Sequence, residues 1–207
     1  EMRHQKLTQA LYDIYELYFV YSIFEIRGHV TKYKIQYTLY FLMYIIGIDP
    51  GTTAIGYAVI KHQPTDPILH DAGMFTVRAR HAPERLKELH ISIQQLLSLW
   101  RPTAVGVEKL FFARNTKTAL AVAEARGVIL LTTALAGITL YEYTPLQIKK
   151  TVTGDGRADK SQIKKMIQII LKGAPHARAR DDVFDAIAIA LTCHYVDYRY
   201  HTDTPKL

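Results

Sequence analysis

The sequence has a single cysteine, Cys193, among its 207 residues. One cysteine excludes a disulfide framework within the chain and is typical of proteins kept in a reducing compartment. Because Cys193 lies in an apolar helical run, we interpret it as a small core residue rather than a nucleophile. No cluster of Cys and His residues has the spacing of a zinc site, so a zinc-binding module is not expected.

Long apolar runs are absent as well. The longest one, at about 38–48, is too short to span a membrane. The chain does not open with the basic, apolar and small-residue succession of a signal peptide. We therefore expect a soluble, cytoplasmic protein. The sequence also shows no internal repeat and no low-complexity tract.

Basic residues outnumber acidic ones, with 26 Lys or Arg against 19 Asp or Glu and a net charge of +7. Residues 1–42 hold five basic and four acidic residues, so nearly all of the excess lies in 43–207. A basic surface suits a polyanion, chiefly through contacts to phosphate groups. Many basic proteins bind no nucleic acid, so the charge permits such a partner without establishing it.

The composition changes near residue 43. Residues 1–42 hold seven of the 14 tyrosines, one glycine and no proline. Apolar residues at helical spacing predict an amphipathic helix over about 7–26. Since Met43 directly precedes a strand pattern, our hypothesis is that 1–42 is upstream read-through or a non-native extension. The alternative is a genuine helical appendage. We expect a domain over 43–197 and a flexible tail over 198–207.

From residue 43 onward, strand and helix patterns alternate. Strands are predicted at about 45–49, 55–61, 69–77, 104–108 and 139–143. Helices are predicted at about 83–99, 115–136, 159–171 and 181–197, with Asn115 as a possible N-cap. Three strands followed by strands that alternate with helices predict an α/β fold with a five-stranded mixed sheet flanked by helices.

Two acidic residues end apolar strand patterns: Asp49 in GIDPG and Glu108 in AVGVE. The carboxyl ends of strands are where α/β folds place their sites. Asp49 alone is equally consistent with a turn residue that accepts from nearby N–H groups. Glu108 alone is consistent with an exposed strand end paired to Lys109 or Arg101.

Two further acidic residues, Asp182 and Asp185, share a face of the helix predicted at about 181–197 because they are three residues apart. Acids in the first turn of a helix are also stabilised by the helix dipole, so capping accounts for either one alone. Asp181 and Asp185 share a face too, and spacing does not choose between 181 and 182.

The four carboxylates together favour a catalytic function. Like charges held close together repel and destabilise a fold unless a cation neutralises them. Carboxylate oxygens suit Mg²⁺ or Mn²⁺, and two such ions about 3.5–4 Å apart support phosphodiester hydrolysis. The sequence therefore predicts a metal-dependent nuclease whose catalytic and metal-binding residues are Asp49, Glu108, Asp182 and Asp185.

Four segments carry a resemblance over about 43–195. In chain order they are MYIIGIDPGTTAIGYAVI, VGVEKLFFARNTKTALAVAEARGVIL, YTPLQIKKTVTGDGRADKSQI and DDVFDAIAIALTCHY. With these motifs the chain resembles the RuvC family of Holliday-junction resolvases, which are ribonuclease-H-like nucleases. The D-x-x-D spacing of that family favours Asp182 over Asp181.

The resemblance implies an activity and partners. It implies a Mg²⁺-dependent endodeoxyribonuclease, with Mn²⁺ as a substitute and two ions per site, that acts on four-way DNA junctions during recombination and repair. A homodimer would nick two strands of like polarity symmetrically and leave 5′-phosphate ends, in cooperation with the RuvA–RuvB branch-migration complex. The helix at about 115–136 matches the dimer-forming helix of the family.

The resemblance also suggests DNA-binding residues. Phe111 matches an aromatic residue that stacks against bases near the junction centre, although a core position is the alternative. Lys149 and Lys160 match basic residues near the scissile phosphate, although each is also consistent with a solvated surface lysine. Arg157 lies in the glycine-rich connection Gly154–Arg157, which can approach a phosphate or serve only as a flexible link.

Three other functions remain open at this point. GIDPGTTAIG resembles the phosphate loop of sugar kinases and actin-like ATPases, but no second glycine-rich motif follows. Another ribonuclease-H-like nuclease, such as a YqgF-type protein, shares the fold. A junction-binding protein without catalysis would share the basic surface; cleavage with Mg²⁺ against binding in EDTA separates it from a nuclease.

Overall fold

The computed structural model describes residues 43–63, 66–109, 116–175 and 179–198. All helices and strands in these ranges belong to one compact unit, Tyr44–Leu207. The extension 1–42, with its predicted helix, and the chain beyond Tyr198 lie outside the described residues. Within the described ranges, no helix has the length and apolar character needed to cross a membrane.

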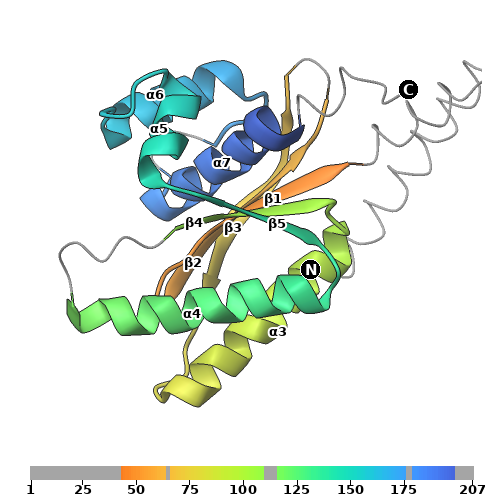
Figure 1. Ribbon diagram of the computed structural model, residues 1–207, viewed down its shortest axis with the longest axis vertical. Helices are drawn as coiled ribbons and strands as arrows, with labels where there is room; N and C mark the ends of the chain where they lie inside the picture. Colours follow the sequence, from red (N-terminus) through yellow and green to blue (C-terminus); the bar gives the residue numbers. More distant parts are fainter. Residues whose placement is uncertain (1–42, 64–65, 110–115, 176–178, 199–207) are drawn as a thin grey trace, which may run out of the picture. The chain divides into compact units, whose positions relative to one another are not determined.

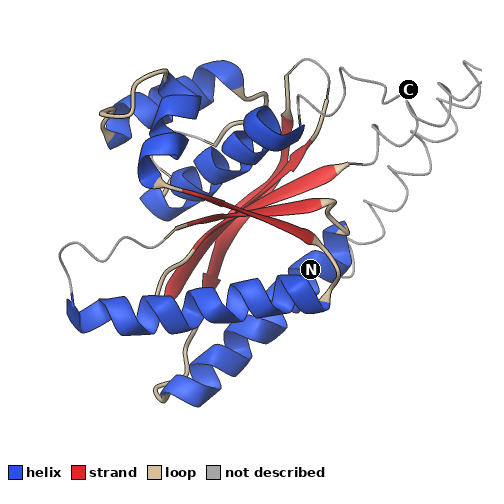
Figure 2. Ribbon diagram, in the orientation of Figure 1, coloured by secondary structure: helices blue, strands red, loops and turns tan. Residues whose placement is uncertain are grey.

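Five strands form one sheet: β1 (Tyr44–Asp49), β2 (Ala54–Lys61), β3 (Ile68–Thr76), β4 (Ala104–Glu108) and β5 (Thr139–Tyr143). Their order across the sheet is β3-β2-β1-β4-β5. β2 is antiparallel to β1 and β3, whereas β4 is parallel to both β1 and β5. The predicted mixed sheet is confirmed (Figure 2). Every strand lies within one residue of its predicted bounds.

Helices cover both faces of this sheet. They are α3 (Ala82–Trp100), α4 (Thr116–Leu135), α5 (Pro145–Thr153), α6 (Lys160–Ile170) and α7 (Asp181–Cys193), followed by the π-helical turn η1 (His194–Tyr198). α3 and α4 lie on one face, and α5, α6 and α7 lie on the other (Figure 1). The unit is therefore a three-layer α/β/α arrangement. The possible N-cap of α4, Asn115, lies outside the described residues.

Helix α5 was not among the helices predicted from the sequence. It begins with a capping box: the Thr144 hydroxyl accepts from the N–H of Gln147 at 3.1 Å, and the Gln147 side chain accepts from the N–H of Thr144 at 2.8 Å. Gly154 ends the helix with a left-handed φ of 80°. Pro145 stands in the first turn, where a missing N–H carries no penalty.

The last predicted helix, at about 181–197, is corrected at its end. The α-helix stops at Cys193 and gives way to the wider turn of η1. There the buried His194 ring lies against His62, and the hydroxyl of Tyr143 donates to Asp197. Both contacts join this turn to segments that lie far away in the sequence.

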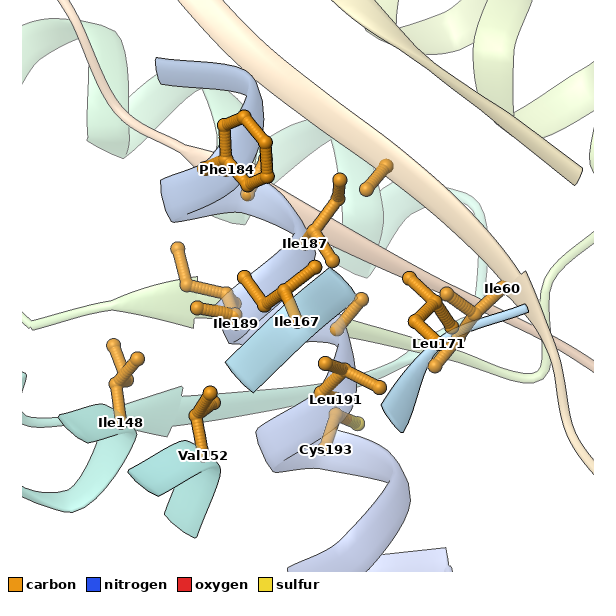
Figure 3. Packing of buried hydrophobic residues seen from close by; sticks show 14 of the residues in the cluster. Ile60, Ile148, Val152, Ile167, Leu171, Phe184, Ile187, Ile189, Leu191 and Cys193 are labelled. Atoms are coloured by element: carbon orange, nitrogen blue, oxygen red, sulfur yellow. The ribbon is translucent and has the colours of Figure 1, made fainter. Parts of the chain in front are cut away.

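Helix α7 is the centre of one of two hydrophobic cores. It is buried from Val183 to Cys193 except at Asp185, and it packs between the sheet and helices α5 and α6 (Figure 3). Cys193 is fully buried, as predicted for a core residue, and burial raises the pKa of its thiol to about 12. The second core lies between the sheet and helices α3 and α4.

Two glycines let α7 approach the sheet closely. A Cβ at Gly47 in β1 would stand 2.2 Å from the carbonyl oxygen of Ala186, and one at Gly56 in β2 would stand 2.0 Å from that of Asp182. No larger residue fits at either position without moving the helix. The glycines thus place the first turns of α7, which carry the acidic pair, directly against β1 and β2.

Candidate active site

Parallel pairing brings the first two acids to one edge of the sheet. β1 and β4 are adjacent, with Ile48 opposite Val107, so both strands end at the same edge. Asp49 and Glu108 are the last residues of these strands. Their predicted arrangement at the carboxyl edge of the sheet is therefore what the structure shows.

The acidic pair of α7 arrives at the same edge from the helical layer. Asp49 pairs across the antiparallel β1–β2 ladder with Gly56. Gly56 lies in turn against the backbone of Asp182. Asp185 stands one turn further along α7. From Val183 to the end of α7, every other residue is buried, and Asp185 is partly exposed. Two strand ends and one helix therefore converge on a shared region.

Mutual repulsion within this group is visible in the pKa of Asp49. Burial raises this pKa from 3.8 to about 8, and the negative charges of Asp185, Glu108 and Asp182 add to the rise, while Lys160 opposes it. Burial and the charge of Asp185 likewise raise the pKa of Glu108. The four carboxylates are thus close enough to act on one another electrostatically.

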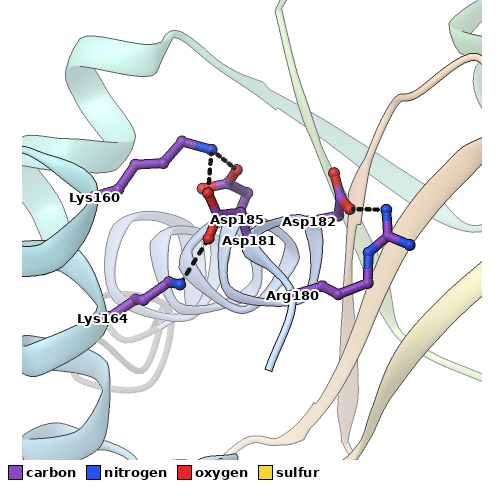
Figure 4. A network of polar contacts seen from close by, with 6 residues as sticks. All are labelled: Lys160, Lys164, Arg180, Asp181, Asp182 and Asp185. Carbon is purple, nitrogen blue, oxygen red and sulfur yellow. Dashed lines mark hydrogen bonds and ion pairs between the residues drawn. The ribbon is translucent and has the colours of Figure 1, made fainter. Parts of the chain in front are cut away.

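Ion pairs hold the acids of α7 (Figure 4). The ammonium group of Lys160 lies 3.0 Å from Asp185 Oδ2. The guanidinium group of Arg180 lies 3.2 Å from Asp182 Oδ2. Both pairs include an exposed basic side chain, and such pairs contribute only about 0–1 kcal/mol each to stability. A ligand of higher charge can therefore displace either basic group at little cost.

Asp181 makes different contacts. Its carboxylate lies 2.6 Å from Lys164 Nζ and 3.4 Å from Lys160 Nζ. Lys164, and then Lys160, hold the pKa of Asp181 below its ordinary value. Asp181 therefore faces helix α6, whereas Asp182 and Asp185 are the acids of α7 whose charges act on Asp49.

The chemistry of this group fits a divalent cation. Within the described residues, no three Asp, Glu, His or Cys side chains already stand together as a ligand set. Two of the four carboxylates are paired with basic groups instead, which separates like charges. Oxygen ligands of this kind are the ones that Mg²⁺ and Mn²⁺ prefer. A cation among them would relieve the repulsion that, after burial, raises the pKa of Asp49.

The predicted DNA-binding residues have different outcomes. Lys149 on α5 and Lys160 on α6 both lower the pKa of Glu108, so both ammonium groups lie near the acids. Arg157 is exposed in the α5–α6 connection, and its backbone N–H donates to Asp155 Oδ1 at 2.9 Å. Phe111 lies outside the described residues.

Sequence reasoning missed one contact at the site. The Nε–H of Arg126, on α4, donates to the carbonyl oxygen of Glu108 at 3.2 Å, and its guanidinium group also pairs with Glu142 on β5. Two weak signals were present in the sequence: a charged residue within a largely apolar helix, and a glutamate within a short strand, where Glu is disfavoured.

Comparisons with known proteins identify a family for this chain. Residues 45–194 match the sequence model of a family described as crossover junction endodeoxyribonuclease RuvC. The protein of that name from Alkaliphilus metalliredigens is 44% identical over 153 residues, which cover 73% of this chain and 92% of the relative.

Solved structures agree as well. The structure of Thermus thermophilus RuvC is matched with a TM-score of 0.64 and 34% identity, over 72% of this chain and 92% of that one. T. thermophilus RuvC in complex with a Holliday junction substrate is matched with a TM-score of 0.63 and 32% identity, over the same shares. The sheet and its flanking helices have the ribonuclease-H-like fold of these proteins.

Proposed function

Because this chain belongs to the RuvC family of crossover junction endodeoxyribonucleases, we propose that Asp49, Glu108, Asp182 and Asp185 form its active site. The protein is an endonuclease that resolves Holliday junctions. The observation that supports the site is the pKa of Asp49, which burial and the charges of the other three acids raise to about 8.

The four acids hold the metal cofactor in this proposal. Asp49 and Glu108 are fixed at strand ends, and Asp182 and Asp185 project from α7. We infer that they bind two Mg²⁺ ions, for which Mn²⁺ substitutes. When bound, such ions activate the attacking water and stabilise the leaving oxygen.

Two lysines act on the phosphate. Lys160 leaves its pair with Asp185, and its ammonium group binds the scissile phosphate together with that of Lys149. Positive charge at this point stabilises the negative charge that develops on the phosphate oxygens. Each cleavage leaves a 5′-phosphate and a 3′-hydroxyl. Phe111 and Arg157 contribute further DNA contacts, by stacking on a base and by binding the backbone.

A homodimer is expected to supply two such sites. Leu120, Leu131 and Leu135 on α4 are 70%, 60% and 73% exposed. Exposed leucines at several points of one helix are typical of a surface that another chain covers. Pairing through α4 would present two active sites to one junction and allow symmetric nicks in two strands of like polarity.

The remaining features of the proposal concern the cell. The protein works in the cytoplasm with the RuvA–RuvB branch-migration complex, in recombination and DNA repair. Residues 43–197 carry the nuclease, and residues 1–42 are an extension that cleavage does not require. The bacterial relative that is 44% identical and matched over 92% of its length supports this division.

One experiment tests the function. A synthetic mobile four-way junction is incubated with the full chain and with residues 43–207, in Mg²⁺ and in EDTA. We expect both proteins to make symmetric nicks with ligatable ends in Mg²⁺ and no nicks in EDTA. If both proteins bind the junction and neither cleaves it, the chain is a non-catalytic junction binder and the proposal is refuted. Cleavage by 43–207 alone would make the extension inhibitory.

A further inference from the structure

Glu108 is held by its backbone from two directions. On one side, β5 fixes the strand end: Glu108 stands opposite Tyr143, and the N–H of Lys109 donates to the Tyr143 carbonyl at 2.8 Å. On the other side, the carbonyl oxygen of Glu108 accepts the Nε–H of Arg126 at 3.2 Å. This second contact comes from α4, which packs on the face of the sheet opposite α7 (Figure 1).

The guanidinium group of Arg126 is itself fixed. It pairs with the carboxylate of Glu142, and the two side chains are only 17% and 33% exposed. Arg126 thus joins three elements, α4, β4 and β5, through one planar group. A guanidinium fork directed at two acceptors has little freedom to move. Partial burial also makes the loss of either partner more damaging than it is at a fully exposed pair.

Strand register explains why the side chains of Glu142 and Glu108 lie on opposite faces of the sheet. Glu142 stands opposite Val107, a residue of the core beneath α3 and α4, so its side chain points toward α4. Glu108 stands opposite Tyr143, a residue of the core around α7, so its side chain points toward the other acids. Arg126 therefore binds the backbone of Glu108 from the face of the sheet opposite the Glu108 carboxylate.

We propose that Arg126 and Glu142 form a positioning pair that holds the end of β4 so that the Glu108 carboxylate meets the other acids. The inference rests on the active site proposed above. Neither residue touches the reacting atoms, and both act through Glu108.

The test uses Arg126→Lys, Arg126→Gln, Glu142→Gln and the double variant Arg126→Gln/Glu142→Gln in the full chain, with Arg85→Gln on α3 as a matched control. Cleavage is measured in single turnover as a function of Mg²⁺ concentration, junction binding in EDTA, and the melting temperature without metal. We expect Arg126→Gln to raise the Mg²⁺ concentration for half-maximal cleavage about tenfold or more, an effect typical of groups that orient metal ligands. Junction binding should stay within about twofold of the unmodified chain, because no phosphate contact is removed.

Two results separate positioning from general stabilisation. Arg126→Lys keeps the charge beside Glu142 but removes the Nε–H, so it should keep the melting temperature and still raise the Mg²⁺ requirement. The double variant should be no worse than Arg126→Gln alone, because the two residues act as a unit. Additive losses, or an Arg126→Lys variant with an unchanged Mg²⁺ requirement, would overturn the inference. If the unmodified chain does not cut at all, the proposed function fails instead.

Discussion

The backbone of Gly56 lies against the carbonyl oxygen of Asp182, which a Cβ at Gly56 would approach to 2.0 Å. Asp49 stands opposite Gly56 in the β1–β2 ladder. Together with the contact between Gly47 and Ala186, this contact sets how near the acids on the helix come to the acids on the strands. The site depends on a missing side chain as much as on the four carboxylates.

Gly56→Ala should impair both stability and cleavage. The added methyl group must push the first turn of α7 away from β2, and overpacking of this kind costs about 1–3 kcal/mol. Thermal unfolding should show a melting temperature lower by several degrees, about 2–4 °C for each kcal/mol. Gly127→Ala is the control for stability, since a Cβ at Gly127 meets nothing within 4 Å. Unchanged cleavage by Gly56→Ala would contradict the described packing.

Asp49→Asn should abolish cleavage and yet stabilise the metal-free protein at high pH. The pKa of Asp49 is about 8 in the folded chain against 3.8 as its ordinary value. A raised folded-state pKa favours folding at low pH, and this contribution is lost as pH rises from about 4 through about 8. In EDTA, the melting temperature of the unmodified chain should therefore fall over this range more than that of the variant.

The measurement is a set of melting curves from pH 5 to pH 9 in EDTA, for both proteins. At pH 9 the variant should melt higher by at least about 4 °C, which corresponds to one or two kcal/mol for a chain of this size. Parallel pH profiles would show that Asp49 is not the group responsible. Junction binding should be equal in the two proteins, because the basic surface is unchanged.

Asp182→Asn and Asp181→Asn should differ sharply. Asp182 acts on the pKa of Asp49, whereas Asp181 pairs with Lys164 at 2.6 Å. We expect Asp182→Asn to lose cleavage by about a hundredfold or more, the scale found when charge stabilisation is removed from an active site. Asp181→Asn should retain its Mg²⁺ requirement and most of its activity. A raised Mg²⁺ requirement in Asp181→Asn would instead make Asp181 a metal ligand.

Lys160→Gln should slow cleavage while lowering the Mg²⁺ concentration that is needed. The Lys160 ammonium group lies 3.0 Å from Asp185 Oδ2, so it competes with a cation for that carboxylate. Its removal frees Asp185 but takes away a positive charge beside the phosphate, which should reduce the maximal rate by about a hundredfold. Lys165→Gln, an exposed change on the same helix, is the control. If Lys160→Gln needed a higher Mg²⁺ concentration for half-maximal cleavage, Lys160 would not compete with the cation for Asp185.

Leu131→Glu should weaken the expected dimer without unfolding the chain. Leu131 is 60% exposed on α4, so a charged residue there is tolerated by a single chain and disfavoured in an apolar interface. Sedimentation velocity should show a larger share of monomer, and junctions should be cut once rather than twice per encounter. A dimer of unchanged strength would place the interface elsewhere.

The sequence predicted the sheet and the convergence of the acids well. Short apolar runs that end in Asp49 and Glu108 define β1 and β4 almost without ambiguity, and strand ends of parallel neighbours must meet. The spacing of Asp182 and Asp185 placed them on one helix face, and the structure brings both close enough to act on Asp49.

Other features depend on contacts between distant segments. No local pattern shows that Arg126 reaches the backbone of Glu108, because that contact requires the register of β4 against β5. Helix α5 was missed because nine residues that begin with proline resemble a loop unless the Thr144 capping box is recognised. The π-helical end of α7 contacts His62 and Tyr143, which lie far away in the sequence.

The helices that carry residues of the proposed site differ in how readily they unfold locally: α7 is buried, whereas α5 and α6 are short and cover it. The amide protons of Ile187 and Leu191 lie in the fully buried part of α7, so their exchange with solvent should require unfolding of the whole unit. Lys149 and Lys160 stand on short helices of the outer layer, where local opening suffices. The proposed metal ligands on α7 thus belong to a deeply buried helix, while the lysines proposed to bind the phosphate stand on helices that can adjust to an irregular DNA backbone.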